Sequence, residues 1–242
     1  MRDMADNHMN LVVHMLSHTD WSRHKTVMKD IFAITEDAGM GVWVDNWGIG
    51  GAPGDKCHFL AYHPEAHSYY GDGIMHPYQI CLNAPSYRQF VKDWVDRVAE
   101  LGAKTIFWDE PLIPHVKIDG TDDFYSCCTC PTCQKMFEER FGKKMPKVMD
   151  KDVSTFRNDV MIEYHKFITE YAHSLGMVNT VCFMPYQLAG MTNQTESEKL
   201  LNFDLDAICA MPYLDNIGTD PYWYPFSVVD GARYVAVRYR TA

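Results

Sequence analysis

Short runs that are mostly apolar alternate in this sequence with longer amphipathic segments. This alternation constrains the fold more than any other feature. The apolar runs predict five buried strands, at residues 11–16, 41–45, 104–108, 178–184 and 205–211. Strands without a polar face are typical of a parallel sheet that helices cover. We therefore expect an α/β fold in which strands and helices alternate.

The amphipathic segments predict the helices of this fold, at residues 22–38, 84–101, 134–141 and 155–175. The clearest is 84–101, in which Phe90, Trp94 and Val98 recur at helical spacing. Ser22 is expected to cap the first helix, and Thr195 with Glu198 has the spacing of a capping box before a further short helix. The end of a helix is expected before residue 11, and the beginning of another within 228–242.

Composition and length bound the kind of protein. The 242 residues show no internal repeat and no interdomain linker, so we predict one domain over 1–242. A net charge of −10 argues against a nucleic-acid partner, which would need a basic face. No run of about 18 apolar residues predicts a membrane span. The polar N-terminus carries no secretory signal, so we expect a cytoplasmic protein, and a homo-oligomer is left open.

Carboxylates and aromatic residues recur where the predicted strands end, which is where parallel α/β folds gather their functional groups. Aromatic rings cover the C–H faces of sugars and carboxylates bind the hydroxyls, so the set predicts a carbohydrate substrate. Its sugar-binding members are Asp20, Trp43, Asp45, Trp47, Tyr186 and Tyr213. For each aromatic residue taken alone, packing in the core or at the rim is the alternative.

Asp109 and Glu110 follow the strand 104–108 directly. A carboxyl group at a buried strand end, beside a second carboxylate, holds its proton to higher pH and suits general acid/base chemistry. We therefore predict Glu110 as the general acid/base, with Asp109 as a second catalytic or a positioning residue. The alternative is a carboxylate pair that caps a neighbouring loop or binds an arginine.

Four of the eight cysteines lie within seven residues, and Cys128-x-Cys130-x-x-Cys133 offers three thiolates. A structural zinc ion needs four ligands. The helix 84–101 should begin near the carboxyl end of strand 104–108, which places Cys81 better than Cys57, in the long loop 46–82. We predict zinc on Cys81, Cys128, Cys130 and Cys133, the last three of which lie in a Cys-rich insertion at about 112–146. A free-thiol or disulfide cluster is the alternative.

Several of these motifs occur in a fixed order: Tyr62-His63-Pro64-Glu65, then Cys81-x-Asn83-x-Pro85-x-Tyr87-Arg88, then the strand ending at Glu110, then Cys128-x-Cys130-Pro-x-Cys133-x-x-x-Phe137. The order resembles the β-galactosidases of glycoside hydrolase family 42 and the wider group of glycosidase-like (β/α)8 barrels with a Cys-rich insertion. The resemblance covers roughly residues 40–145.

The resemblance implies a TIM-like (β/α)8 barrel, a retaining mechanism, Glu110 as the acid/base at the end of the fourth strand, and a structural zinc on the four cysteines named above. Where the family has an asparagine that binds the sugar 2-hydroxyl, this chain has Asp109. Counting from the fourth strand predicts an incomplete barrel that lacks the first and the last two strands, with the nucleophile beyond residue 242.

Two other function classes stay open at this point. A non-catalytic carbohydrate-binding or degenerate barrel would fit Asp109 and the missing nucleophile. A metal-dependent hydrolase would use His14, Asp20, Asp45 and Asp109, although no His-x-His or His-Glu-x-x-His spacing supports it.

Overall fold

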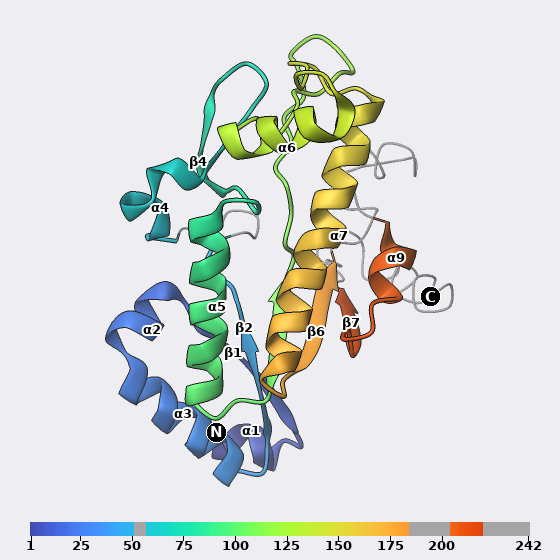
Figure 1. Ribbon diagram of the computed structural model, residues 1–242. Helices are drawn as coiled ribbons and strands as arrows, with labels where there is room; N and C mark the ends of the chain where they lie inside the picture. The colour runs from blue at the N-terminus through green and yellow to red at the C-terminus, as the bar shows by residue number, and fades with distance from the viewer. Residues whose placement is uncertain (51–56, 184–203, 220–242) are drawn as a thin grey trace.

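The computed structural model describes residues 1–50, 57–183 and 204–219 (Figure 1). Within these residues five strands form one parallel sheet in the order β1-β2-β5-β6-β7. The strands are β1 (Leu11–Met15), β2 (Gly41–Asp45), β5 (Thr105–Asp109), β6 (Val178–Phe183) and β7 (Asn216–Thr219). Strands that are neighbours in the sheet also follow one another along the chain, which is the order of a (β/α) barrel.

Helices cover one face of this sheet, with α5 and α7 in front of the strands in Figure 1. The helices of this layer and its surroundings are α1 (Arg2–Asp6), α2 (His18–Arg23), α3 (Lys25–Asp37), α5 (Pro85–Glu100), α7 (Lys151–Ser174) and α9 (Leu205–Cys209). Val44, Ile106 and Val181 are fully buried beneath them. Trp108 packs on Trp94 of α5, with 5.6 Å between ring centroids. The apolar residues on this face of the strands are therefore covered by helices.

The opposite face of the sheet carries the alternate residues of each strand. Val13 pairs with Trp43 in register, and Phe107 pairs with Thr180. The Trp43 and Phe107 rings are stacked, with 6.5 Å between centroids and 24° between planes. Val13 remains 43% exposed on this face. In a closed barrel this is the inner face, so Trp43 and Asp45 project toward the barrel interior.

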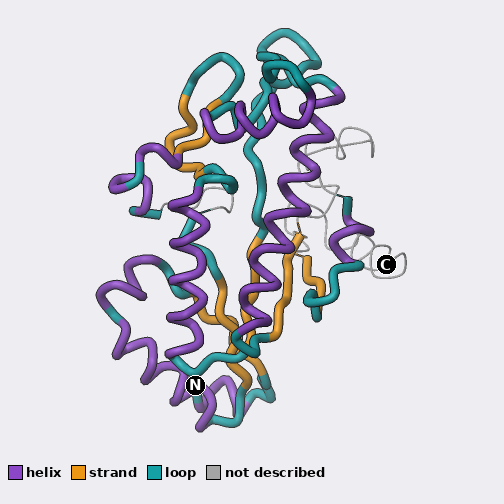
Figure 2. Tube along the Cα trace, in the orientation of Figure 1, coloured by secondary structure: helices purple, strands orange, loops and turns teal. Residues whose placement is uncertain are grey.

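An additional layer lies above the sheet in Figure 1, beyond the carboxyl ends of the strands. It contains α4 (Phe59–Tyr62), a 3-10 turn (Pro64–Ala66), the antiparallel hairpin of β3 (His67–Tyr69) and β4 (Met75–Ile80), and α6 (Pro131–Phe141). Figure 2 shows the long loop segment that joins β5 to α6. The hairpin occupies part of the stretch 46–82, which the sequence predicts only as a long loop.

The prediction of a strand at 205–211 is wrong, because these residues include the helix α9. The Asp204 side chain caps this helix by accepting a hydrogen bond from the Ala207 N–H, with 3.0 Å between Oδ1 and N. The fifth strand is β7, which begins seven residues after Cys209, at Asn216.

The prediction of one helix over 22–38 is also wrong in its beginning. The segment is divided into α2 and α3 at His24, and Ser17 rather than Ser22 is the N-cap. The capping-box pattern at 195–198, the tail 228–242 and Tyr186 lie outside the described residues.

Candidate active-site edge and metal centre

Asn46 joins the carboxyl ends of β2 and β5. Its Oδ1 accepts a hydrogen bond from the Asp109 N–H at 2.5 Å, and its own N–H donates to the Phe107 carbonyl at 3.3 Å. The Asn46 side chain is buried. A buried amide with a fixed partner holds the two strand ends in one relative position.

Asp109 and Glu110 lie at this junction and are nearly inaccessible, with 9% and 6% exposure. The Glu110 N–H donates to the Cys182 carbonyl of β6 at 3.3 Å. The Glu110 backbone is left-handed, with φ of 42°. A residue with a side chain is strained in this conformation, which costs of order 1–3 kcal/mol and is typical of functional positions. The backbone therefore leaves the strand abruptly at Glu110.

The end of β2 contributes Asp45 and Trp47 to the same edge. Asp45 Oδ1 accepts a hydrogen bond from the Trp47 N–H at 2.7 Å, so the carboxylate fixes the turn that follows the strand. Trp43, Asp45 and Trp47 are all half-buried. Their positions leave part of each side chain accessible from the inner face or the rim.

Asp20 and Tyr213 do not share this arrangement. The Asp20 carboxylate accepts hydrogen bonds from the Ser17 N–H at 3.1 Å and from the Ser17 hydroxyl at 2.6 Å, in a capping box at the start of α2. Tyr213 precedes β7 instead of following a strand, and its ring stacks on His173, near the end of α7, at 4.2 Å. The prediction that Tyr213 lies at the carboxyl edge is therefore wrong.

The metal-dependent hydrolase alternative also fails on geometry. His14 Nε2 is 3.0 Å from Thr35 Oγ1 of α3, so this ring faces the helical layer. Asp45 pairs with Met15, the residue after His14, and therefore lies on the opposite face of the sheet. Among the described residues, the group of side chains able to hold a metal is formed by cysteines alone.

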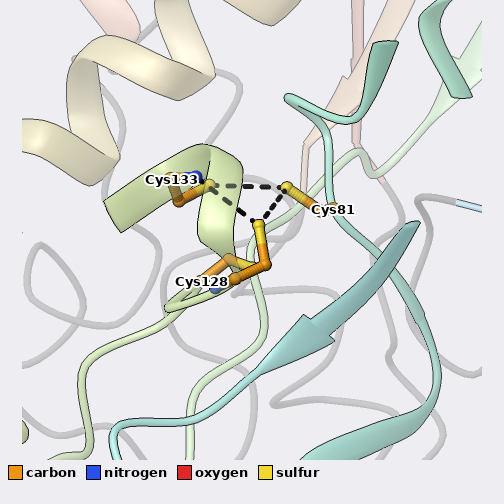
Figure 3. Close-up of side chains that lie close together, drawn as sticks. Cys81, Cys128 and Cys133 are labelled. Atoms are coloured by element: carbon orange, nitrogen blue, oxygen red, sulfur yellow. Dashed lines mark hydrogen bonds between the residues drawn. The ribbon is translucent and has the colours of Figure 1, made fainter. Parts of the chain in front are cut away.

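The four cysteines predicted as metal ligands lie together. The Sγ atoms of Cys81, Cys128, Cys130 and Cys133 are all within 4.8 Å of one another and buried. Cys81 follows β4, and Cys133 lies in the first turn of α6. Figure 3 shows Cys81, Cys128 and Cys133 with their sulfur atoms pointing toward one another. None of the eight cysteines forms a disulfide, so the cluster is not a disulfide framework.

The spacing of these sulfur atoms fits a tetrahedral metal ion. The Cys81 and Cys133 sulfurs are 3.4 Å apart and the Cys81 and Cys130 sulfurs 3.5 Å apart. Four Zn–S bonds of about 2.3 Å would place the sulfurs about 3.8 Å apart, so only a small expansion is needed. The donor set suits a divalent ion with a preference for thiolates, such as Zn²⁺.

The protonation of the thiols follows from their contacts. Hydrogen bonds from Cys127 and Cys130 hold the pKa of Cys128 well below its usual value. Cys81 and Cys133 each form a hydrogen bond with Cys128, and this bond raises the pKa of both. A bound divalent cation would stabilise the deprotonated form of these thiols as well, because its positive charge makes nearby negative charge favourable.

Other groups orient the sulfur ligands. Asn83 Nδ2 donates to the Cys133 sulfur at 3.3 Å, and Asn83 Oδ1 accepts from Arg88 Nη2 at 3.1 Å. The Cys133 N–H donates to the Cys130 sulfur at 3.5 Å. Hydrogen bonds of this kind fix the direction of metal ligands and tune the metal site.

The hairpin and the cysteine-bearing loop are joined to each other. The Thr129 hydroxyl donates to the Tyr70 carbonyl at 2.8 Å, and Gln79 Nε2 donates to the Leu112 carbonyl at 3.2 Å. A Cβ on Gly71 would lie 1.9 Å from the Lys147 carbonyl oxygen, so only glycine allows this approach. The cluster is thus enclosed between the hairpin, the loop and α6.

Arg157 and Asn83 are functional candidates that the sequence analysis does not select. Arg157 is fully buried on α7, and its guanidinium contacts the segment that carries the cysteines. Arg157 has helical spacing to Met161, Tyr164 and Ile168, so it is a cation within an otherwise apolar helix face. This pattern in the sequence could have indicated it. No comparable pattern marks Asn83, apart from its place two residues after Cys81.

Comparisons with known proteins agree with this geometry at the level of the fold. No family model matches the sequence, and no curated protein is similar to it in sequence. Among solved structures, the β-galactosidase from the psychrophilic Marinomonas ef1 is similar with a TM-score of 0.60 and 12% identity. That match covers 91% of this chain and 38% of the β-galactosidase. The catalytic domain of β-amylase from Paenibacillus polymyxa is similar with a TM-score of 0.57 and 13% identity, over 89% of this chain and 70% of that one.

The chain has the fold of an incomplete (β/α)8 barrel. At identities of 12% and 13% the likeness establishes the fold, and activity and substrate are matters for proposal. Among the described residues, no helix has both the length and the apolar character to cross a membrane.

Proposed function

We propose that this barrel acts as a glycoside hydrolase, of the kind that the family 42 β-galactosidases represent, with Glu110 as the general acid/base. The observation that carries the proposal is the position of Glu110, buried beside Asp109 at the carboxyl end of a central strand of the sheet. Enzymes with barrel folds gather their catalytic groups at this edge. Both solved structures described above are carbohydrate-processing enzymes by name.

In this proposal Glu110 donates a proton to the glycosidic oxygen as the bond from that oxygen to the sugar breaks. In a retaining mechanism it then accepts a proton from the water that releases the sugar. Such a mechanism needs a second carboxyl group about 5–5.5 Å from the first. We place this nucleophile outside the described residues, at the end of the seventh strand of the barrel, where the resemblance to the family 42 enzymes puts it.

The sugar would be held by the groups around Glu110. Trp43 and Trp47 offer aromatic faces, and Asp45 and Asp109 offer carboxylates for the hydroxyls; Tyr186 remains a proposed member from outside the described residues. Asp109 would bind the sugar rather than exchange a proton, and the hydrogen bond from its N–H to Asn46 fixes where its side chain leaves the strand. Asp20 would contribute from the first turn of α2, which its capping box with Ser17 fixes.

A zinc ion on Cys81, Cys128, Cys130 and Cys133 would serve structure. Four thiolates complete a tetrahedral shell and leave no open coordination position for a water or a substrate. The ion would hold the hairpin and the cysteine-bearing loop above the carboxyl edge of the sheet.

Hydrolysis of a panel of 4-nitrophenyl glycosides by the full polypeptide that carries this sequence tests the proposal. We expect turnover of at least one β-glycoside and its loss by a factor of about 10² or more in Glu110→Gln. Glu138→Gln, on the exposed surface of α6, is the matched control and should keep full activity. Sugar binding without any turnover by the unmodified protein would favour the non-catalytic carbohydrate-binding barrel instead.

A further inference from the structure

Arg157 is a buried cation on α7, where this helix contacts the loop that carries the cysteines. Its side chain is 1% exposed. Nη1 donates to the Cys127 carbonyl at 2.8 Å and to the Pro114 carbonyl at 3.0 Å, and Nη2 donates to the Ile113 carbonyl at 3.1 Å. One guanidinium on α7 therefore fastens both the segment that leaves β5 and the loop that carries the cysteines.

These hydrogen bonds do not neutralise the positive charge. The salt bridges found among the described residues do not include Arg157, and its acceptors are backbone carbonyls. An uncompensated charge removed from water costs several kcal/mol. Burial lowers the pKa of the Arg157 guanidinium, whereas the neighbouring Cys127 and Cys128 raise it. The Cys127 carbonyl that Nη1 binds belongs to the residue directly before Cys128, so the guanidinium lies beside the loop that carries the predicted metal ligands.

The cavity beside the cysteines places the two features together. Cys81, Cys128 and Cys133 line it, and so do Ile113 and Pro114, whose carbonyls Arg157 binds. Phe156 and Val160, which flank Arg157 on α7, also line it. The part of α7 that carries Arg157 therefore borders the cavity of the cysteine cluster.

We propose that Arg157 is the counter-cation of a four-thiolate metal centre formed by Cys81, Cys128, Cys130 and Cys133. A divalent ion with four thiolates carries a net charge of −2, and the guanidinium offsets part of it inside the protein. This inference rests on the metal site that we propose above, and it assigns to Arg157 a role in the affinity of the metal rather than in catalysis.

Zinc affinity of the full polypeptide, measured by competition with a chromogenic chelator, tests this role. Arg157→Met removes the charge and keeps much of the side-chain length, so it should weaken zinc binding about tenfold or more. Arg157→Lys keeps the charge and should lose less. Lys166→Met is the matched control, because Lys166 is an exposed cation on the same helix and should leave the affinity unchanged.

Thermal unfolding with and without zinc separates a metal-linked role from a purely structural one. If Arg157 acts through the metal, the increase in melting temperature that zinc produces shrinks in Arg157→Met. An equal loss of melting temperature in the presence and absence of zinc would overturn the inference, as would unchanged zinc affinity.

Two remaining outcomes are also decisive. If Arg157→Met does not fold, the zinc affinity of Arg157→Lys decides. An affinity equal to that of the unmodified protein supports the requirement for charge, and an affinity as low as that of variants lacking one of the four cysteines contradicts it. An unmodified protein that binds no zinc would remove the inference together with the metal site. Turnover plays no part in these measurements, so the glycosidase proposal stands or falls separately.

Discussion

The Asp109 N–H donates to Oδ1 of Asn46 at 2.5 Å, and this bond ties the end of β5 to the turn after β2. Because Glu110 is the next residue, the bond fixes the point from which the proposed acid/base leaves the strand. The side chain of one strand end thus positions the backbone of its neighbour at the edge where barrel enzymes do their chemistry.

Asn46→Ala should therefore destabilise the fold and reduce turnover together. A buried N–H without its acceptor costs about 1–3 kcal/mol, which should appear in the free energy of unfolding measured with urea. Asn7→Ala removes an exposed amide that donates to the Asp3 carbonyl, and should change stability by less than about 0.5 kcal/mol. Equal stability of the two variants would mean that the Asn46 contact does not hold the strand ends.

Replacing a cysteine of the cluster should release the metal and loosen the additional layer above the sheet. Cys133→Ser is expected to reduce the zinc content from one ion per chain to below one-tenth, measured by atomic emission, since thiolate is a much better zinc ligand than hydroxyl. It should also increase proteolytic cleavage between residues 111 and 150. Cys209→Ser, on the exposed α9 cysteine, should change neither quantity. Wild-type zinc content in Cys133→Ser would contradict the ligand set.

Gly71→Ala should be more destabilising than an ordinary glycine substitution. Its Cβ would meet the Lys147 carbonyl oxygen at 1.9 Å, and backbone on both sides must move to relieve the clash. We expect a loss of about 1–3 kcal/mol in the free energy of unfolding. Gly120→Ala has open space around its Cβ but a φ of +72°, so it reports backbone strain alone and should lose less. The reverse order would show that the hairpin does not pack on Lys147 as described.

His165 should make stability depend on pH below neutrality. Burial lowers its pKa from 6.5 to about 4, and Nδ1 donates to the Met161 carbonyl at 2.7 Å. The unfolded chain binds the proton first, so this contribution is complete above pH 6.5 and is lost as the pH falls toward 4. The loss should reach about 3 kcal/mol.

His165→Gln should flatten this part of the curve of unfolding free energy against pH, and His24→Gln, an exposed histidine, should not. A His165→Gln curve parallel to that of the unmodified protein between pH 4 and 6.5 would show that His165 is not the group responsible.

Much of the fold could be predicted from the sequence because local pattern and tertiary position agree. Val12, Val44, Ile106 and Val181 lie in mostly apolar runs, and each run is a strand within about one residue of its predicted bounds. The cysteine cluster could be predicted because ligand spacing selected Cys128, Cys130 and Cys133 and strand-to-helix topology selected Cys81, and the four lie together.

The failures have equally local causes. The run from Leu205 to Met211 is compatible with both a buried strand and a short helix. The N-cap at Asp204 stabilises the helix. The misplacement of Tyr213 follows from that error. The role of Arg157 depends on carbonyls at positions 113, 114 and 127, and no sequence pattern brings these groups together before the chain is folded.

The most direct test of the account is the dependence of turnover on the leaving group in Glu110→Gln. A proton donor matters most when the departing oxygen is strongly basic. We predict that Glu110→Gln loses kcat/KM by a factor of about 10² or more for a methoxyphenyl glycoside and by much less for the dinitrophenyl glycoside of the same sugar. An equal loss for both substrates, or no loss for either, would contradict the assignment of Glu110 as the general acid.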